Sequence, residues 1–78
     1  MNGGFIQVEG NNRDFTGILM NGGTIIIKGD CGKYTGNSMS GGRIYVHKNI
    51  EGIGNESYEH KNIKRGRIYE KGKLVFER

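Results

Sequence analysis

The feature that most constrains this 78-residue chain is a repeat of nineteen residues. Residues 3–21 and 22–40 share a Gly-Gly pair, an Ile, a Gly, a Thr-Gly pair and a Met at the same spacing, so that seven of nineteen positions are identical. Gly41-Gly42 then opens a third block in the same register. A fixed period of about twenty residues is the signature of a solenoid, in which each repeat forms one coil stacked on the previous one.

Apolar and polar residues alternate in each block over 5–9, 24–28 and 43–47, the pattern of a strand with one buried face. Stacked coils place equivalent residues about 4.8 Å apart, as in a parallel sheet, and parallel crossovers are right-handed. The sequence therefore predicts an all-β fold, a short right-handed parallel β-helix of three to four coils. Its inward side chains are expected to be the columns Ile6, Ile25 and Ile44; Val8, Ile27 and Val46; and Met20 and Met39.

Glycines mark the expected corners of each coil. Glycine adopts positive φ without the steric cost of a Cβ atom, so the chain can turn sharply between short strands. At least one of Gly23 and Gly42 is expected to have a positive φ. The full set of expected corner residues is Gly3, Gly4, Gly10, Gly17, Gly22, Gly23, Gly29, Gly36, Gly41, Gly42 and Gly66.

The third block departs from the repeat after its strand, because residues 49–64 lack the Thr-Gly-x-x-Met phrase. Gly66-Arg67-Ile68-Tyr69 then repeats Gly42-Arg43-Ile44-Tyr45 after 24 residues instead of nineteen. We therefore expect an insertion in the third return path. The prediction is one solenoid domain, residues 1–78, made of regular coils (1–48), an irregular return (49–64) and a terminal strand and hairpin (65–78).

The net charge of +4 is concentrated near the end of the sequence. Residues 61–78 contain seven basic residues against Glu70 and Glu77. The basic residues are Lys61, Lys64, Arg65, Arg67, Lys71, Lys73 and Arg78. The longest apolar run, 25–27, is far shorter than the roughly 18 residues of a membrane span, and a single cysteine favours a reducing compartment. We expect a cytoplasmic protein with no membrane partner.

The sequence predicts no catalytic, cofactor or metal site. Cys31 is the only thiol, and the candidate bases for its activation are His47 and His60. The stacked register places Cys31 over Ile50, several residues from the column of His47. Two histidines and one cysteine do not make a structural zinc site. Residues 29–34 lack the first glycine and the final Ser or Thr of a phosphate-binding loop. We expect no enzyme activity and no cofactor.

A glycine-rich phrase recurs in one register, Gly22-Gly23-x-Ile25-x-Ile27-x-Gly29-x-x-Gly32-x-x-x-Gly36-x-x-Met39. It resembles the glycine-repeat (GXGXG) β-helix domain, which is found at the C-terminal end of the large chain of glutamate synthase and as one of the separate subunits of formylmethanofuran dehydrogenase. The resemblance covers residues 3–46 well and 65–70 weakly. Arg13 replaces the glycine equivalent to Gly32, and the chain has about half the family's number of coils. The resemblance implies a non-catalytic β-helix that packs between or against catalytic units.

Three functions remain to be compared. The first is a structural module that acts through protein–protein contacts, in which residues 1–10 are covered by a second copy or by a larger enzyme subunit. The second is a small nucleic-acid-binding protein, which would use the basic residues of 61–78 together with Tyr69 and Phe76. Nucleic acid is the less favoured partner, because lysines also guard exposed strand edges. The third, a small enzyme, is disfavoured because no column combines an acid, a base and a nucleophile.

Overall fold

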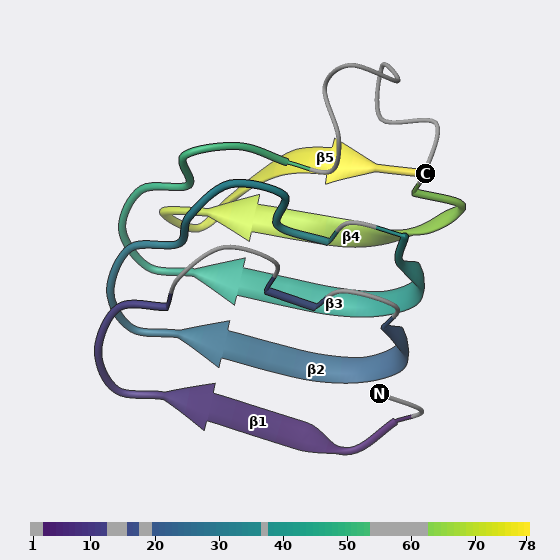
Figure 1. The fold of residues 1–78 in the computed structure, drawn as a ribbon, viewed down its shortest axis with the longest axis horizontal. Helices are drawn as coiled ribbons and strands as arrows, with labels where there is room; N and C mark the ends of the chain where they lie inside the picture. Colours follow the sequence, from purple (N-terminus) through teal and green to yellow (C-terminus); the bar gives the residue numbers. More distant parts are fainter. Residues whose placement is uncertain (1–2, 13–15, 18–19, 37, 54–62) are drawn as a thin grey trace.

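The protein is all-β, with a single, mostly parallel sheet. The computed structural model describes residues 3–12, 16–17, 20–36, 38–53 and 63–78, and within these ranges the chain forms strands and no helix. The strands are β1 (Phe5–Val8), β2 (Asn21–Ile27), β3 (Ser40–Val46), β4 (Arg65–Glu70) and β5 (Lys73–Glu77). They are ordered β1-β2-β3-β4-β5, with β1 to β4 parallel and β5 antiparallel to β4 (Figure 1).

The register of the parallel strands follows the sequence repeat, as predicted. Ile6 aligns with Ile25, and Ile25 aligns with Ile44. A second column aligns in the same way and contains Val8, Ile27 and Val46. Ile44 aligns with Ile68 in β4, although the spacing there is 24 residues instead of nineteen. The additional residues are therefore accommodated outside the strands.

The buried side chains lie on one side of this sheet. The core consists of Met20, Ile25, Ile27, Cys31, Met39, Ile44, Val46, Ile63 and Ile68. Val8 is half-buried and packs against it. Ile6 departs from the prediction, since 46% of its surface is exposed. The expectation that Ile6 is buried like Ile25 and Ile44 is wrong. β1 is an edge strand of the sheet, and no described strand lies beyond it to cover Ile6.

The segments that lead from one parallel strand to the next, here called return segments, also hydrogen-bond to one another. Cys31 pairs in parallel with Ile50, as the sequence predicted, and Thr35 pairs in parallel with Ile53. The backbone N–H of Gly36 donates to the carbonyl of Thr16 at 2.6 Å. Parallel pairing therefore links the return segments as well as the strands. The centre of the predicted insertion, residues 54–62, lies outside the described residues.

Several glycines occupy positions where neighbouring segments of the chain leave no room for a side chain. Gly23 (φ 85°) and Gly42 (φ 96°) both have positive φ, which confirms the prediction for this pair. A Cβ atom on Gly42 would lie 2.7 Å from Met20 Cε and 2.9 Å from the carbonyl carbon of Gly22. Positive φ also occurs at the expected corner residues Gly3, Gly4, Gly17, Gly22, Gly36 and Gly66. Glycine at position 42 is thus required by both its backbone conformation and the space around it.

A hairpin joins β4 to β5, as predicted. Its two turn residues, Lys71 (φ 53°) and Gly72 (φ 82°), both have positive φ. Positive φ at both central residues is characteristic of the type I′ turn, whose twist suits a two-residue hairpin. Backbone hydrogen bonds in both directions between Gly66 and Arg78, at 3.1 and 3.0 Å, close the other end of the hairpin.

Candidate functional site

The single thiol is part of the core. Cys31 is 3% exposed, and its Sγ donates a hydrogen bond to Thr16 Oγ1 at 2.9 Å. His47, one of the two bases considered for it, is exposed at the end of β3, and His60 lies outside the described residues. A reactive cysteine needs access to its substrate as well as a nearby base. The surroundings of Cys31 therefore favour a packing role.

Metal-binding residues do not gather in the part of the chain that the structure describes. No group of three or more His, Cys, Asp or Glu side chains there is arranged to hold a metal ion. Within the same ranges, no helix has the length and apolar character needed to cross a membrane.

A ladder of side-chain hydrogen bonds, which the sequence analysis missed, stacks the corners that follow the parallel strands. The backbone N–H of Asp30 donates to Asn11 Oδ1 at 2.8 Å, and the backbone N–H of Asn49 donates to Asp30 Oδ1 at 2.9 Å. The sequence contains a signal for this ladder, because Asn11, Asp30 and Asn49 are spaced nineteen residues apart, as the repeat is. The side chains of Asn11 and Asp30 thus each satisfy a backbone donor in the next corner, which helps to set the spacing of the corners.

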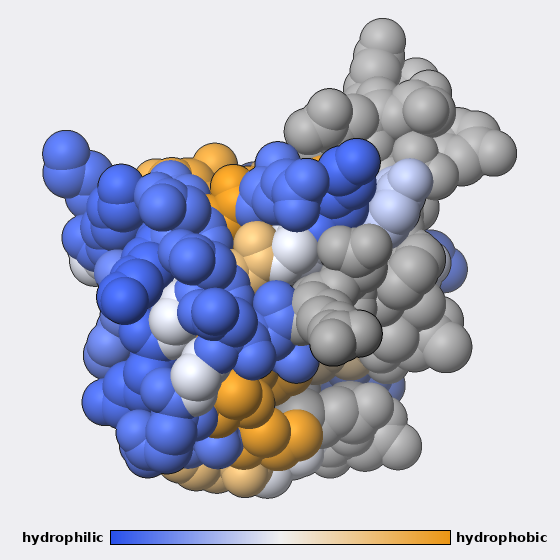
Figure 2. Space-filling view, turned by 60° about the vertical axis from the view of Figure 1, so that its left-hand side comes forward, coloured by the Kyte–Doolittle hydropathy of each residue, from blue (hydrophilic) through white to orange (hydrophobic). Residues whose placement is uncertain are grey.

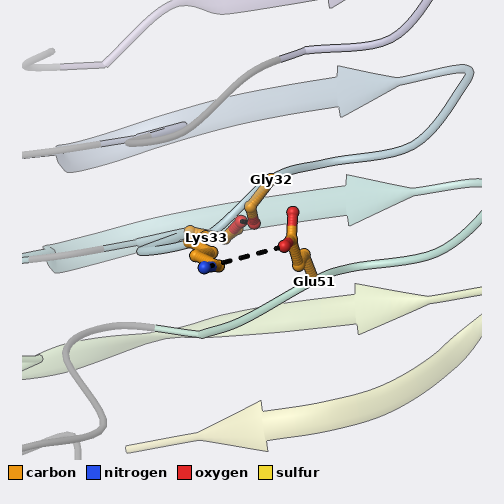
Figure 3. Close-up of polar contacts among 4 residues, drawn as sticks. Gly32, Lys33 and Glu51 are labelled. Atoms are coloured by element: carbon orange, nitrogen blue, oxygen red, sulfur yellow. Dashed lines mark hydrogen bonds and ion pairs between the residues drawn. The ribbon is translucent and has the colours of Figure 1, made fainter.

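An ion pair connects two return segments. Lys33 Nζ lies 3.9 Å from Glu51 Oε1, and both side chains are 60% exposed. Figure 3 shows the two side chains pointing toward one another from neighbouring segments. The nineteen-residue spacing also aligns Lys33 with Asp14, which lies outside the described residues. An exposed pair of this kind contributes well under ~1 kcal/mol, so it contributes little to stability.

The outer edge of β1, together with Phe5 and Ile6, forms one candidate contact surface, here called the β1 end. Phe5 is 62% exposed and Ile6 is 46% exposed. Within the described residues β1 pairs only with β2, so its other edge has no strand partner. Figure 2 shows hydrophobic surface toward this lower end of the molecule. Hydrophobic side chains and unpaired backbone groups are therefore exposed together.

A shallow groove across the beginnings of β2, β3 and β4 forms the second candidate surface, here called the arginine groove. Its volume is about 820 Å³. Its glycine residues are Gly23, Gly41, Gly42 and Gly66, and its charged residues are Arg43, Arg65, Arg67, Arg78 and Glu77. The strand register shifts at the Gly-Gly pairs of β2 and β3. Such irregularities bend strands and redirect side chains, which accounts for a hollow at this position.

Arg67 of the groove forms an ion pair with Glu77. Arg67 Nε lies 2.5 Å from Glu77 Oε2. This hydrogen bond, the negative charge of Glu77 and a smaller contribution from Tyr69 raise the pKa of Arg67 above its ordinary value. The sequence places Arg65, Arg67 and Arg78 in the basic segment, and its repeated Gly-Arg-Ile-Tyr phrase aligns Arg67 with Arg43, but it does not bring these arginines together in one hollow. The parallel register of β3 and β4 places Arg43 beside Arg67.

Comparison of the chain with protein-family models, with curated proteins and with solved structures gives no match. The resemblance to the glycine-repeat β-helix domain therefore depends on the recurring glycine phrase alone. The β1 end and the arginine groove are the two surfaces from which a function can be inferred.

Proposed function

We propose that this chain is a short right-handed parallel β-helix that serves as a non-catalytic assembly module, acting through protein–protein contacts at its β1 end. The parallel columns of the strands and the parallel pairing of the return segments at Cys31 and Thr35 support the β-helix. The hydrogen-bonded corners at Asn11, Asp30 and Asn49 support it as well. The proposed place in the glycine-repeat family agrees with this role, since the family's β-helix packs against catalytic units.

The observation that carries the proposal is the exposure of Ile6. In the same column, Ile25 is 6% exposed and Ile44 is fully buried, whereas Ile6 is 46% exposed. Fully burying an isoleucine side chain contributes ~1.5–3 kcal/mol, so covering the exposed part of Ile6 would contribute on the order of 1 kcal/mol. A partner that extended the column would gain this energy.

The backbone of β1 supports the same interpretation. An unpaired strand edge offers a row of N–H and C=O groups to which another chain can add a strand. Phe5, also in β1, is 62% exposed and would supply additional apolar contact. The proposed partner is a second copy of this chain or a larger enzyme subunit, in keeping with a role in an oxidoreductase or amidotransferase assembly.

Sedimentation velocity at micromolar concentration, combined with a pull-down from native cell extract, tests the proposal. The wild-type protein is expected to self-associate or to retain a larger subunit, and Ile6→Lys is expected to weaken that association at least about tenfold. Val75→Lys is the matched control, because Val75 is 43% exposed on β5 at the opposite end of the sheet. A monomer with no partner, or equal behaviour of the two variants, would overturn the proposal.

Nucleic-acid binding by residues 61–78 is the alternative, and the positions of its aromatic residues weaken it. The ring of Tyr69 is stacked on Tyr45, and Phe76 is half-buried against the core. Binding of single-stranded nucleic acid relies on aromatic faces that are open to the bases. Lys61 lies outside the described residues. We therefore place the assembly role first.

A further inference from the structure

We propose that the arginine groove binds a phosphate-bearing small ligand of about nucleotide size. This site is separate from the β1 end and does not depend on the assembly role. It lies across the starts of β2 to β4, and its volume of about 820 Å³ falls within the range of roughly 300–1,000 Å³ typical of small-molecule sites.

Two arginines lie side by side in adjacent strands at this site. Arg43 of β3 aligns with Arg67 of β4, and neighbouring strands are only about 4.8 Å apart. Like charges in such directly opposed positions are destabilising. Glu77 compensates Arg67, but Arg43 forms no ion pair with any described residue. The groove therefore has positive charge that its own residues leave uncompensated.

The other two arginines extend this charge across the groove. Arg65 begins β4, is exposed, and has no carboxylate partner in the described part of the chain. Arg78 is held in place, because its Nη1 donates to the carbonyl of Ile63 at 3.0 Å and its guanidinium lies 5.8 Å from the centre of the Phe76 ring. The groove thus combines the guanidinium groups of four arginines with a single acidic side chain, that of Glu77.

The chemistry of these groups favours phosphate. A guanidinium presents parallel N–H donors that match two phosphate oxygens, and such charge-assisted bonds are among the strongest that side chains make. Gly42 and Gly66 also line the groove. The tyrosines that follow on the same two strands, Tyr45 and Tyr69, stack on each other. Recognition would therefore depend on the phosphate group and not on base stacking.

Isothermal titration calorimetry with inorganic pyrophosphate tests this site. We expect saturable one-site binding to the wild-type protein, weakened about tenfold by Arg43→Gln and by Arg65→Gln, since each removes a hydrogen bond between charged groups. The matched control is Lys48→Gln, which removes the same charge from an exposed corner outside the groove and should leave affinity unchanged. If Arg43→Gln fails to fold by circular dichroism, Arg43→Lys keeps the charge and should still weaken binding through loss of the bidentate geometry.

Several outcomes would overturn the proposal. These are the absence of saturable binding, an equal loss of affinity in Lys48→Gln, and binding of a short oligothymidylate without binding of pyrophosphate. Binding of the oligothymidylate alone would mean that the arginines bind a polynucleotide and not a small phosphate-bearing ligand. Ile6→Lys should bind pyrophosphate like the wild-type protein, because Ile6 is not part of the groove. Failure of this site would therefore be distinguishable from failure of the assembly role.

Discussion

The rings of Tyr45 and Tyr69 stack with their centroids 4.7 Å apart and their planes 9° from parallel, although 24 residues separate them in the chain. They are aligned neighbours on β3 and β4. The segment between them is five residues longer than the nineteen-residue repeat, yet β4 pairs with β3 in the register that matches Gly42-Arg43-Ile44-Tyr45 to Gly66-Arg67-Ile68-Tyr69. The Tyr45–Tyr69 stack can therefore be used to test whether β3 and β4 pair in this register.

A double-mutant cycle on this pair should reveal a favourable coupling. We expect Tyr45→Leu and Tyr69→Leu each to lower the free energy of unfolding, and the coupling between them to be about 0.5–1.5 kcal/mol, the usual strength of an aromatic pair beyond area burial. Urea denaturation of the four proteins gives the values. Tyr69→Phe is the control, since it preserves the ring stack. Additive single-mutant effects would contradict the stacked geometry.

Substitution of Gly42 should be far more costly than substitution of Gly10. Gly42→Ala would place its Cβ 2.9 Å from the carbonyl carbon of Gly22 and force an L-residue to φ 96°. Strain of this kind costs on the order of 1–3 kcal/mol. At Gly10 a Cβ would meet nothing within 4 Å, so Gly10→Ala should change stability by less than about 0.5 kcal/mol. Thermal melting of both variants measures the difference, and equal melting temperatures would show that the corner at Gly42 tolerates a side chain.

The repeat in the sequence was sufficient to predict the parallel register, because equivalent residues such as Ile25 and Ile44 must align when the period is constant. The terminal hairpin was predictable from Lys71-Gly72 between two alternating segments. The exposure of Ile6 was not predictable in this way. The alternation of apolar and polar residues identifies which face of the strand a side chain occupies, but not whether a neighbouring strand covers that side chain. Burial at the end of a sheet depends on neighbours that the pattern does not describe.

The hydrogen-bonded corners and the arginine groove also differ in how far the sequence predicts them. The Asn11, Asp30 and Asn49 ladder was detectable, since its spacing equals the repeat, but polar residues at corners were not considered as hydrogen-bond acceptors for the next corner. The arginine groove required the structure. Arg43 and Arg65 lie in different blocks, and only the pairing of β3 with β4 and the irregular strand starts bring them to one hollow.

Asp30 should stabilise the protein through its carboxylate as an acceptor. In Asp30→Ala the backbone N–H of Asn49 would lose its partner at 2.9 Å. We expect a loss of about 1 kcal/mol in the free energy of unfolding, because an exposed donor is partly satisfied by water. Asp30→Asn retains an acceptor oxygen and should stay within about 0.5 kcal/mol of the wild-type protein. If both variants lost the same stability in urea denaturation, the charge of Asp30 and not its ladder bond would be responsible.

The thiol of Cys31 should be protected from reagents in the native protein. It is 3% exposed, belongs to the core, and donates its hydrogen to Thr16. Modification by a thiol reagent requires a structural opening, so the labelling rate should be slower by on the order of a hundredfold or more than in the unfolded chain. Spectrophotometric labelling of the same sample in native buffer and in denaturing urea measures the ratio. Intermediate urea should raise the rate in step with unfolding, since Cys31 pairs with Ile50 between two return segments and cannot be exposed without separating them. Immediate labelling in native buffer would show that this part of the core opens freely, and would reinstate Cys31 as a candidate reactive residue.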